Sequence, residues 1–111
     1  MEAKELMIGD WISRDGKPRR YMAADWVYVS KCTPIALSPE ILENNDFWSE
    51  NNVWSWWDDE HTKSVDIYWN YDIAHVEAEN NLHTHIETNI TDVHELQHIL
   101  RMAGINLEIK L

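Results

Sequence analysis

The segment His94-Glu95-Leu96-Gln97-His98 matches the H-E-x-x-H motif of zinc proteases. On a helix this spacing places two imidazoles on one face, with the glutamate positioned to activate a zinc-bound water. Such enzymes take a third zinc ligand from a later position in the chain. Here the position of a third histidine holds Gly104, and the later glutamate, Glu108, lies in a predicted strand rather than on a helix. The sequence therefore predicts no catalytic zinc site and no cofactor. A zinc-dependent hydrolase with His94 and His98 as ligands and Glu95 as base is kept as an alternative.

The helical pattern also predicts that the two histidines of this motif face solvent. Apolar residues recur at helical spacing and form one stripe: Val93, Leu96, Ile99, Leu100 and Ala103. At about 100° per residue, His94 and His98 lie on the other side of the helix. We therefore expect Leu96→Asp to unfold the domain. We expect the double variant His94→Ala, His98→Ala to change the melting temperature little.

A second histidine pair occurs in a segment with strand-like alternation. His83 and His85 share one predicted strand face and make half of a transition-metal site, which His75 or His94 would complete. A polar outer face of a half-buried strand is the simpler interpretation. The sequence thus offers His83 and His85 as metal-ligand candidates without predicting that they bind a metal.

Seven tryptophans are many for a chain of 111 residues, and they concentrate around residues 48–57. In a strand, Trp54 and Trp56 point to one face and Trp57 to the other, so one face is either core or an exposed stacking platform. The acidic residues that come directly after Trp57 disfavour the binding of nucleic acid at this platform. The candidate binding residues are Trp54, Trp56, Asp58, Asp59 and Glu60.

Composition and charge narrow the class of protein. A hydrophobic fraction of 44% over 111 residues is enough for one folded domain. Cys32 is the only cysteine, which excludes an internal disulfide and favours a reducing, cytoplasmic location. No signal peptide and no membrane partner are expected. The net charge of the chain is −11. Residues 1–31 carry +1, and residues 32–111 carry −12 from three basic and fifteen acidic residues. Such a field favours a basic protein partner over nucleic acid.

The helices and strands that position these residues can also be predicted from the sequence. Together they indicate an α+β fold with mostly antiparallel strands in one domain. Asp15-Gly16 predicts a hairpin tip, whose basic residues Arg14, Lys17, Arg19 and Arg20 are interpreted as solvated. Strands are expected over residues 6–12, 26–29, 53–57, 65–71, 82–87 and 105–111. Ser38-Pro39 opens a short helix that fades near residues 44–46. Asp92, with Glu95 in a capping box, opens a long helix that Gly104 ends.

Three ordered stretches resemble a family of small uncharacterised proteins encoded in Bacteroidetes prophages and other mobile elements. They are Leu6-x-Ile8-Gly9-Asp10-Trp11, then Pro34-Ile35-x-Leu37-Ser38-Pro39-Glu40-Ile41-Leu42-Glu43-x-Asn45-x-Phe47, and Val93-His94-Glu95-Leu96-Gln97-His98 through Ile105. The resemblance implies a small barrel-like β unit at residues 1–37, succeeded at 38–111 by a helix, strands, a helix and a terminal strand. It implies no established activity. The chain departs from the family at Ala36, where proline is usual, and in the aromatic density of residues 48–57.

These observations support three hypotheses of function. The leading one is a non-catalytic interaction or accessory module of a prophage or mobile element, acting through its acidic C-terminal two-thirds. The second is an acidic DNA mimic that inhibits a DNA-binding protein, and the third is the zinc hydrolase. Homodimerisation through a strand edge or the tryptophan-rich segment is a further expectation.

Overall fold

The computed structural model of the chain describes residues 6–81 and 84–111. In chain order the elements are β1 (Trp11–Arg14), β2 (Lys17–Arg20), the 3-10 helix η2 (Ala23–Lys31), β3 (Cys32–Pro34), α1 (Pro39–Glu43), β4 (Trp48–Glu50), β5 (Val53–Trp57), β6 (Lys63–Asn70), β7 (Ile73–Asn80), β8 (His85–Ile90) and α2 (Val93–Met102). They form a three-stranded sheet in the order β2-β1-β3 and a five-stranded sheet in the order β4-β5-β6-β7-β8, both antiparallel. The predicted α+β class is confirmed.

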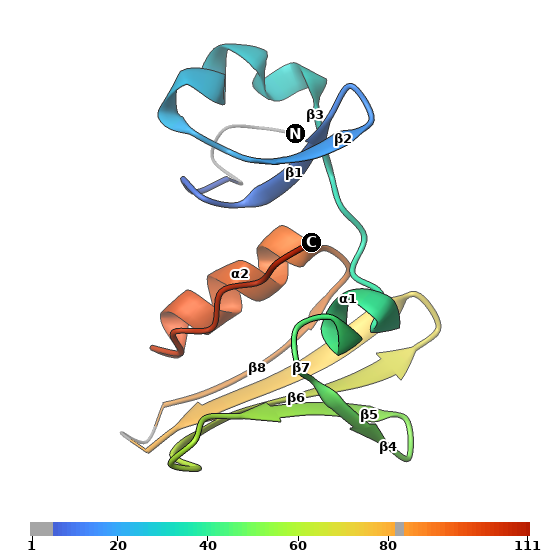
Figure 1. Ribbon diagram of the computed structural model, residues 1–111, viewed down its shortest axis with the longest axis vertical. Coiled ribbons are helices and arrows are strands. Elements are labelled where there is room, and N and C mark those ends of the chain that lie inside the picture. The colour runs from blue at the N-terminus through green and yellow to red at the C-terminus, as the bar shows by residue number, and fades with distance from the viewer. Residues whose placement is uncertain (1–5, 82–83) are drawn as a thin grey trace.

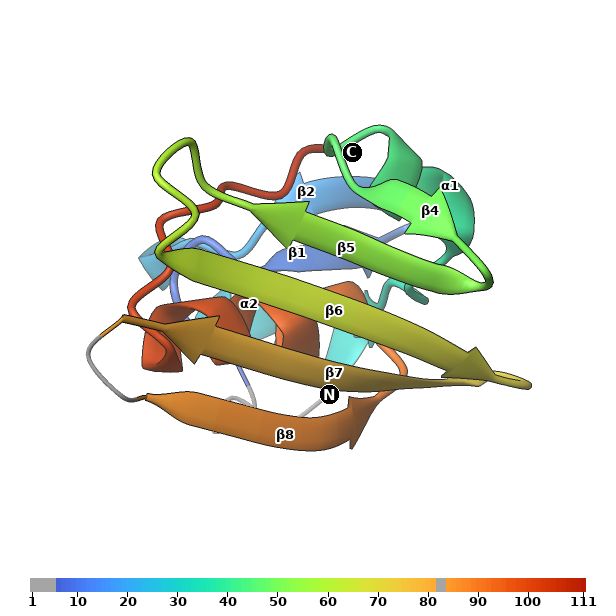
Figure 2. The same cartoon turned by 90° about the horizontal axis from the view of Figure 1, so that it is seen from below.

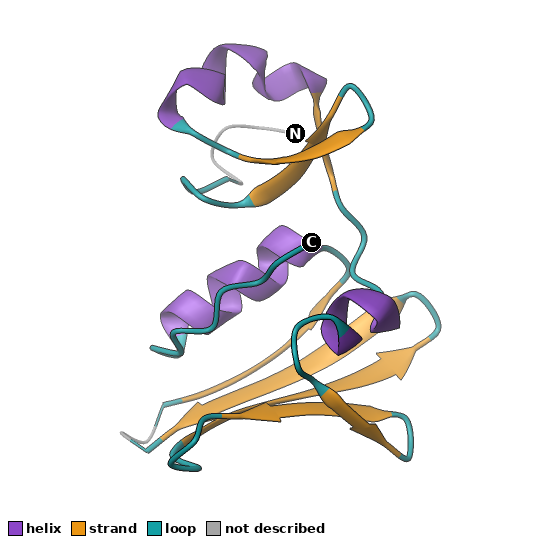
Figure 3. Cartoon of the chain, viewed as in Figure 1, coloured by secondary structure: helices purple, strands orange, loops and turns teal. Residues whose placement is uncertain are grey.

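The layers of the molecule succeed one another along its long axis. η2 lies over the small sheet, α2 lies between the two sheets, and the five-stranded sheet closes the other end (Figure 1; coloured by element type in Figure 3). Among the described residues, β2 and β3 are the edges of the small sheet, so the N-terminal unit that the resemblance predicts to be barrel-like is a three-stranded sheet without a closed barrel. None of the helices in the described part of the chain reaches the length and apolar character of a membrane span.

Local signals in the sequence set the turns and helix ends where they were predicted. Asp15 and Gly16 have φ of 55° and 76° and make the two-residue turn of the β1–β2 hairpin. The Ser38 hydroxyl accepts the Ile41 backbone N–H at 3.3 Å and caps α1. At the start of α2, Glu95 Oε1 accepts the Asp92 N–H at 3.2 Å, as the capping-box pattern predicts.

The main core lies between α2 and the inner face of the five-stranded sheet. Alternate residues of β6 and β7 are fully buried there, and the apolar stripe of α2 packs onto them: Val65, Ile67, Ala74, Val76, Ala78, Val93, Leu96, Ile99, Leu100 and Ala103. The predicted stripe of α2 is thus confirmed. A second, smaller cluster of Leu6, Ile12, Tyr21 and Cys32 lies in the N-terminal unit.

The other side of α2 is covered by the N-terminal unit, so the prediction that His94 and His98 face solvent is wrong. His94 is 6% exposed. His98 Nε2 lies 2.5 Å from Oδ2 of the fully buried Asp10, and Gln97 Oε1 accepts the Trp11 backbone N–H at 2.8 Å. A polar helix face is normally a solvated face. Here it meets a second sheet through hydrogen bonds, which periodicity does not reveal.

Residues 26–29, predicted as a strand, belong to η2 instead. The buried Asp25 explains the difference: its Oδ2 accepts the Met22 backbone N–H at 2.8 Å and fixes a turn where the segment begins. Arg14 Nη1 and Arg19 Nη2 lie 3.6 and 3.0 Å from the Asp25 carboxylate. Arg20 Nη2 lies 2.6 Å from Glu108 Oε1. All three arginines of the hairpin therefore make ion pairs rather than remaining only solvated.

Residues 105–111 make no strand ladder, although a final strand was predicted there. The alternation itself is right, since Ile109 is buried. The backbone groups bond to side chains instead: the Asn45 amide pairs with both the N–H and the carbonyl of Lys110, each at 2.7 Å, and the Trp11 indole N–H donates to the Ile109 carbonyl at 2.6 Å. Hydrophobic alternation indicates which residues are buried but not which groups satisfy the backbone.

Other strand boundaries also differ from the prediction. β4 and β7 have no counterpart among the predicted strands, because β4 is short and the alanines and glutamates of β7 are depleted in strands generally. The first strand begins at Trp11 rather than at residue 6. The strand predicted over 82–87 is observed as His85–Ile90, with residues 82–83 outside the described part. Tyr71 lies in the β6–β7 turn and is 97% exposed.

Candidate functional site

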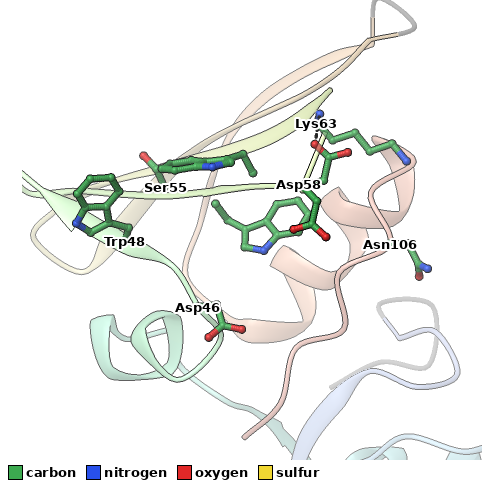
Figure 4. A pocket seen from close by; sticks show the side chains of 9 residues that line it. Asp46, Trp48, Ser55, Asp58, Lys63 and Asn106 are labelled. Atoms are coloured by element: carbon green, nitrogen blue, oxygen red, sulfur yellow. Dashed lines mark hydrogen bonds between the residues drawn. The ribbon is translucent and has the colours of Figure 1, made fainter. Parts of the chain in front are cut away.

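The short edge strand β4 leaves the end of β5 open. β4 pairs with residues 53–55 only, so Trp56 and Trp57 have β6 as a neighbouring strand on one side and no described strand on the other. Beside this open edge the structure has a concavity of about 470 Å³. Its lining residues are Asp46, Trp48, Ser55, Trp56, Trp57, Asp58, Asp59, Lys63 and Asn106, and we call it the Trp48–Trp57 pocket (Figure 4).

Two exposed indoles form the aromatic wall of this pocket. The exposed fractions of Trp48 and Trp57 are 61% and 39%, and their ring centroids are 5.9 Å apart at an interplanar angle of 59°. The His61 ring stacks on Trp57, with centroids 6.0 Å apart. The Trp57 indole therefore contacts two other rings and is still partly exposed.

Asp58 is engaged in the β5–β6 turn. Its carboxylate accepts the backbone N–H groups of Thr62 and Lys63 at 2.7 and 3.0 Å and the Thr62 hydroxyl at 2.7 Å. The Thr62 hydroxyl bond, together with the backbone bonds, lowers the pKa of Asp58. Asp58 is therefore an ionised, structurally fixed negative charge at the pocket wall.

Asp46 and Asp59 are the carboxylates of the pocket that remain available to a ligand. Neither makes a side-chain hydrogen bond or ion pair within residues 6–81 and 84–111. Asp46 comes after α1 in the left-handed region, with φ of 67°. Figure 4 shows the Asp46 carboxylate below Trp48 and Asn106 at the far side, so the groups surround one space. With two exposed indoles, and with the carboxylates of Asp46, Asp58 and Asp59 outnumbering the ammonium group of Lys63, the pocket suits a cationic group.

The structure separates the predicted binding residues. Trp56, Asp58 and Asp59 line the Trp48–Trp57 pocket, whereas Glu60 does not. Trp54 packs against the main core and lines another cavity. Two further lining residues were not predicted: Trp48, which the β4–β5 pairing brings to the site, and Asp46, which precedes β4. The density of tryptophan around residues 48–57 is the sequence signal that could have indicated Trp48.

A larger cavity, of about 680 Å³, lies toward the start of β5, between Trp54, Trp69 and the start of α2. It also contains Asp72 and Asp92. Burial raises the pKa of Asp92, so the negative charge of this carboxyl group is less favoured than that of an exposed one. This cavity lacks a pair of exposed indoles in mutual contact, and we place the candidate binding site in the Trp48–Trp57 pocket despite its smaller volume.

The H-E-x-x-H residues are engaged in structural contacts. Glu95 Oε1 accepts the Thr91 N–H, the Thr91 hydroxyl and the Asp92 N–H, each at 3.2 Å. His98 Nε2 is bound to Asp10. The base position of a zinc hydrolase is thus used to cap α2. Buried His94 Nδ1 has no hydrogen-bond partner among the described residues.

The second predicted histidine pair is only partly described, because His83 lies outside the described residues. His85 is on the outer face of the five-stranded sheet, the solvent side of β8, as the simpler interpretation predicts. Its Nδ1 lies 2.8 Å from Glu79 Oε1 and its Nε2 3.6 Å from Glu87 Oε2. The bond with Glu79, together with the weaker contribution of Glu87, raises the pKa of His85.

Comparison with known proteins gives no family for this chain: no family model matches it, and neither a curated protein nor a solved structure is significantly similar to it. The resemblance to prophage-encoded proteins stays a prediction. A function for this protein must therefore be inferred from the geometry of its site.

Proposed function

We propose that this protein is a non-catalytic interaction module that binds a basic segment of a partner protein in the Trp48–Trp57 pocket. The observation that carries the proposal is that two exposed indoles 5.9 Å apart share one concavity with the carboxylates of Asp46 and Asp59. An accessory role in a prophage or mobile element belongs to the same proposal and rests on the sequence resemblance alone.

The chemistry of the pocket favours a lysine or arginine side chain. A cation is attracted to the face of a tryptophan ring, and a nearby carboxylate adds a charge-assisted hydrogen bond. The concavity of about 470 Å³ is large enough to hold a side chain with its flanking backbone. The excess of acidic residues over 32–111 adds long-range attraction for such a segment.

Calorimetric titration with short peptides tests this proposal. We expect a peptide with adjacent lysines or arginines to bind, and its lysine-acetylated form to bind far more weakly. Trp57→Ala should weaken binding about 5- to 30-fold, the range that corresponds to a cation–π contact of about 1–2 kcal/mol. Asp59→Asn should weaken it about 5-fold and reduce its dependence on salt.

Two variants match these changes outside the pocket. Trp26→Ala removes another exposed indole, on η2, and Asp15→Asn removes another exposed carboxylate, at the hairpin tip. Both should bind the peptide like the unmodified protein. Equal binding of the acetylated peptide, or an unchanged affinity of Trp57→Ala, would contradict the proposal.

The DNA-mimic hypothesis shares the electrostatics but differs in the partner. A DNA mimic engages the DNA-binding surface of its target, so duplex DNA should displace it. If a basic partner is released by duplex DNA and no short peptide reproduces its binding, the DNA-mimic hypothesis replaces the interaction module.

A further inference from the structure

β7 and β8 present a second cluster of polar side chains, on the outer face of the five-stranded sheet. Directly opposed residues share a face, and three such pairs lie here: His75 with Asn89, Glu77 with Glu87, and Glu79 with His85. Figure 2 is a view onto this face, and no other described segment crosses in front of β7 and β8. The cluster shares no residue with the Trp48–Trp57 pocket.

The His75 imidazole is aimed at two carboxylates. Its Nε2 lies 2.8 Å from Glu87 Oε1 and 3.7 Å from Glu77 Oε1. Its other nitrogen, Nδ1, lies 2.7 Å from the Asn89 side-chain oxygen. One ligand atom from each of His75, Glu77 and Glu87 lies within 4.8 Å of the others.

We propose that His75, Glu77 and Glu87 bind a divalent transition-metal ion, represented by Zn²⁺, which links β7 to β8. Zinc holds imidazole nitrogen and carboxylate oxygen at about 2.0–2.2 Å, so the ligand atoms of a tetrahedral site are about 3.3–3.6 Å apart. The observed separations of 2.8 and 3.7 Å from His75 Nε2 lie on either side of that range. Small rotations of these partly exposed side chains would bring the ligand atoms to that spacing.

The arrangement of charge supports a cation at this position. Asp66, Glu77 and Glu87 form a row of directly opposed acidic residues across β6, β7 and β8, and like charges directly opposed destabilise a sheet. A bound divalent cation between two of these carboxylates relieves their repulsion.

The orientation of His75 is the one that a metal-binding histidine needs. Histidine ligands usually donate the N–H of the ring nitrogen away from the metal to a fixed oxygen, which sets the tautomer and the ring angle. The Asn89 side-chain oxygen occupies that position behind His75 Nδ1. The imidazole also separates this site from an acidic calcium or magnesium site, where the ligands are oxygens. Asn89 is a positioning residue, and no ligand role is assigned to it.

Titration of chelator-treated protein with Zn²⁺ and, separately, Ca²⁺ tests the proposal, with calorimetry as the readout. We expect one Zn²⁺ per chain at this site and no comparable Ca²⁺ binding. Asn89→Ala should weaken Zn²⁺ binding about 10-fold, within the range for residues that orient a ligand. His75→Gln and Glu77→Gln should weaken it more. Zn²⁺ should raise the unfolding temperature of the unmodified protein and not that of His75→Gln, since a ligand stabilises the state it binds.

His61→Ala is the matched control, because His61 is exposed and lies outside the cluster; it should keep the affinity for Zn²⁺. In NMR spectra, Zn²⁺ should shift His75 Nε2 much more than the same nitrogen of His61. Zinc binding that persists in both His75→Gln and Glu77→Gln, or equal binding of Ca²⁺, would overturn the proposal. Trp57→Ala should not alter zinc binding, so failure of this site and failure of the peptide site are distinguishable.

Discussion

Asp10 joins the N-terminal unit to α2 through its buried carboxylate. Its carboxylate is fully buried, accepts the Met7 N–H at 2.8 Å and the Arg101 guanidinium at 2.9 Å, and lies 2.5 Å from His98 Nε2. A buried carboxylate is tolerated only when it is paired and hydrogen-bonded. Each partner of Asp10 therefore has a structural role.

For His98 this reverses the expectation from the sequence. His98→Ala removes a hydrogen bond to a buried carboxylate and should lower the free energy of unfolding by about 1–3 kcal/mol. His98→Gln, which keeps a donor, should lose less, and His61→Ala should change little. Urea denaturation measures all three. An unchanged midpoint for His98→Ala would show that Arg101 alone suffices for Asp10.

At the scale of elements, the C-terminal segment is held by side chains in place of a strand ladder. Asn45 is buried, and its amide donates to the Ile41 and Lys110 carbonyls at 2.7 Å each and accepts the Lys110 N–H at 2.7 Å. One side chain thus joins the end of α1 to the last residues of the chain.

Asn45→Ala should therefore release residues 105–111. It leaves partly buried backbone groups without their partner, and we expect a loss of about 1–3 kcal/mol in the free energy of unfolding. The Lys110 amide should exchange with solvent much faster, as hydrogen-exchange NMR would detect. Asn106→Ala, an exposed position on the same segment, is the control. Unchanged protection of the Lys110 amide would mean that apolar burial of Ile109 holds the segment.

For the whole molecule, α2 is the layer shared by both sheets. Its apolar stripe faces the five-stranded sheet, and Gln97 and His98 face the N-terminal unit. Loss of the helix should therefore disrupt both ends of the protein together.

Leu96→Asp tests this, because Leu96 is fully buried. The change replaces apolar packing of about 2–5 kcal/mol with a buried charge, which exceeds what a small domain tolerates. We expect loss of near-ultraviolet circular dichroism from the tryptophans and of dispersed NMR signals from both sheets. Met102→Asp, at an exposed position of the same helix, should leave the spectra intact. Native signals from the β1–β2 hairpin in Leu96→Asp would show that the N-terminal unit folds independently.

The sequence alone determined the features that depend on neighbouring residues. The turn at Asp15-Gly16, the caps of α1 and α2, the stripe of α2 and the alternation over 105–111 arise from local backbone preference and periodicity. These signals act within a few residues, so a sequence is enough to predict them.

Only the tertiary structure decided which surfaces meet. The polar face of α2 is covered because a second sheet lies on it, and the pocket exists because β4 stops short of Trp56. The approach of His75 to Glu87 depends on the register of β7 against β8. A shift of that register by one residue would turn one of these side chains to the other face. Contacts of this kind join residues distant in sequence, and hydrophobic periodicity carries no information about their partners.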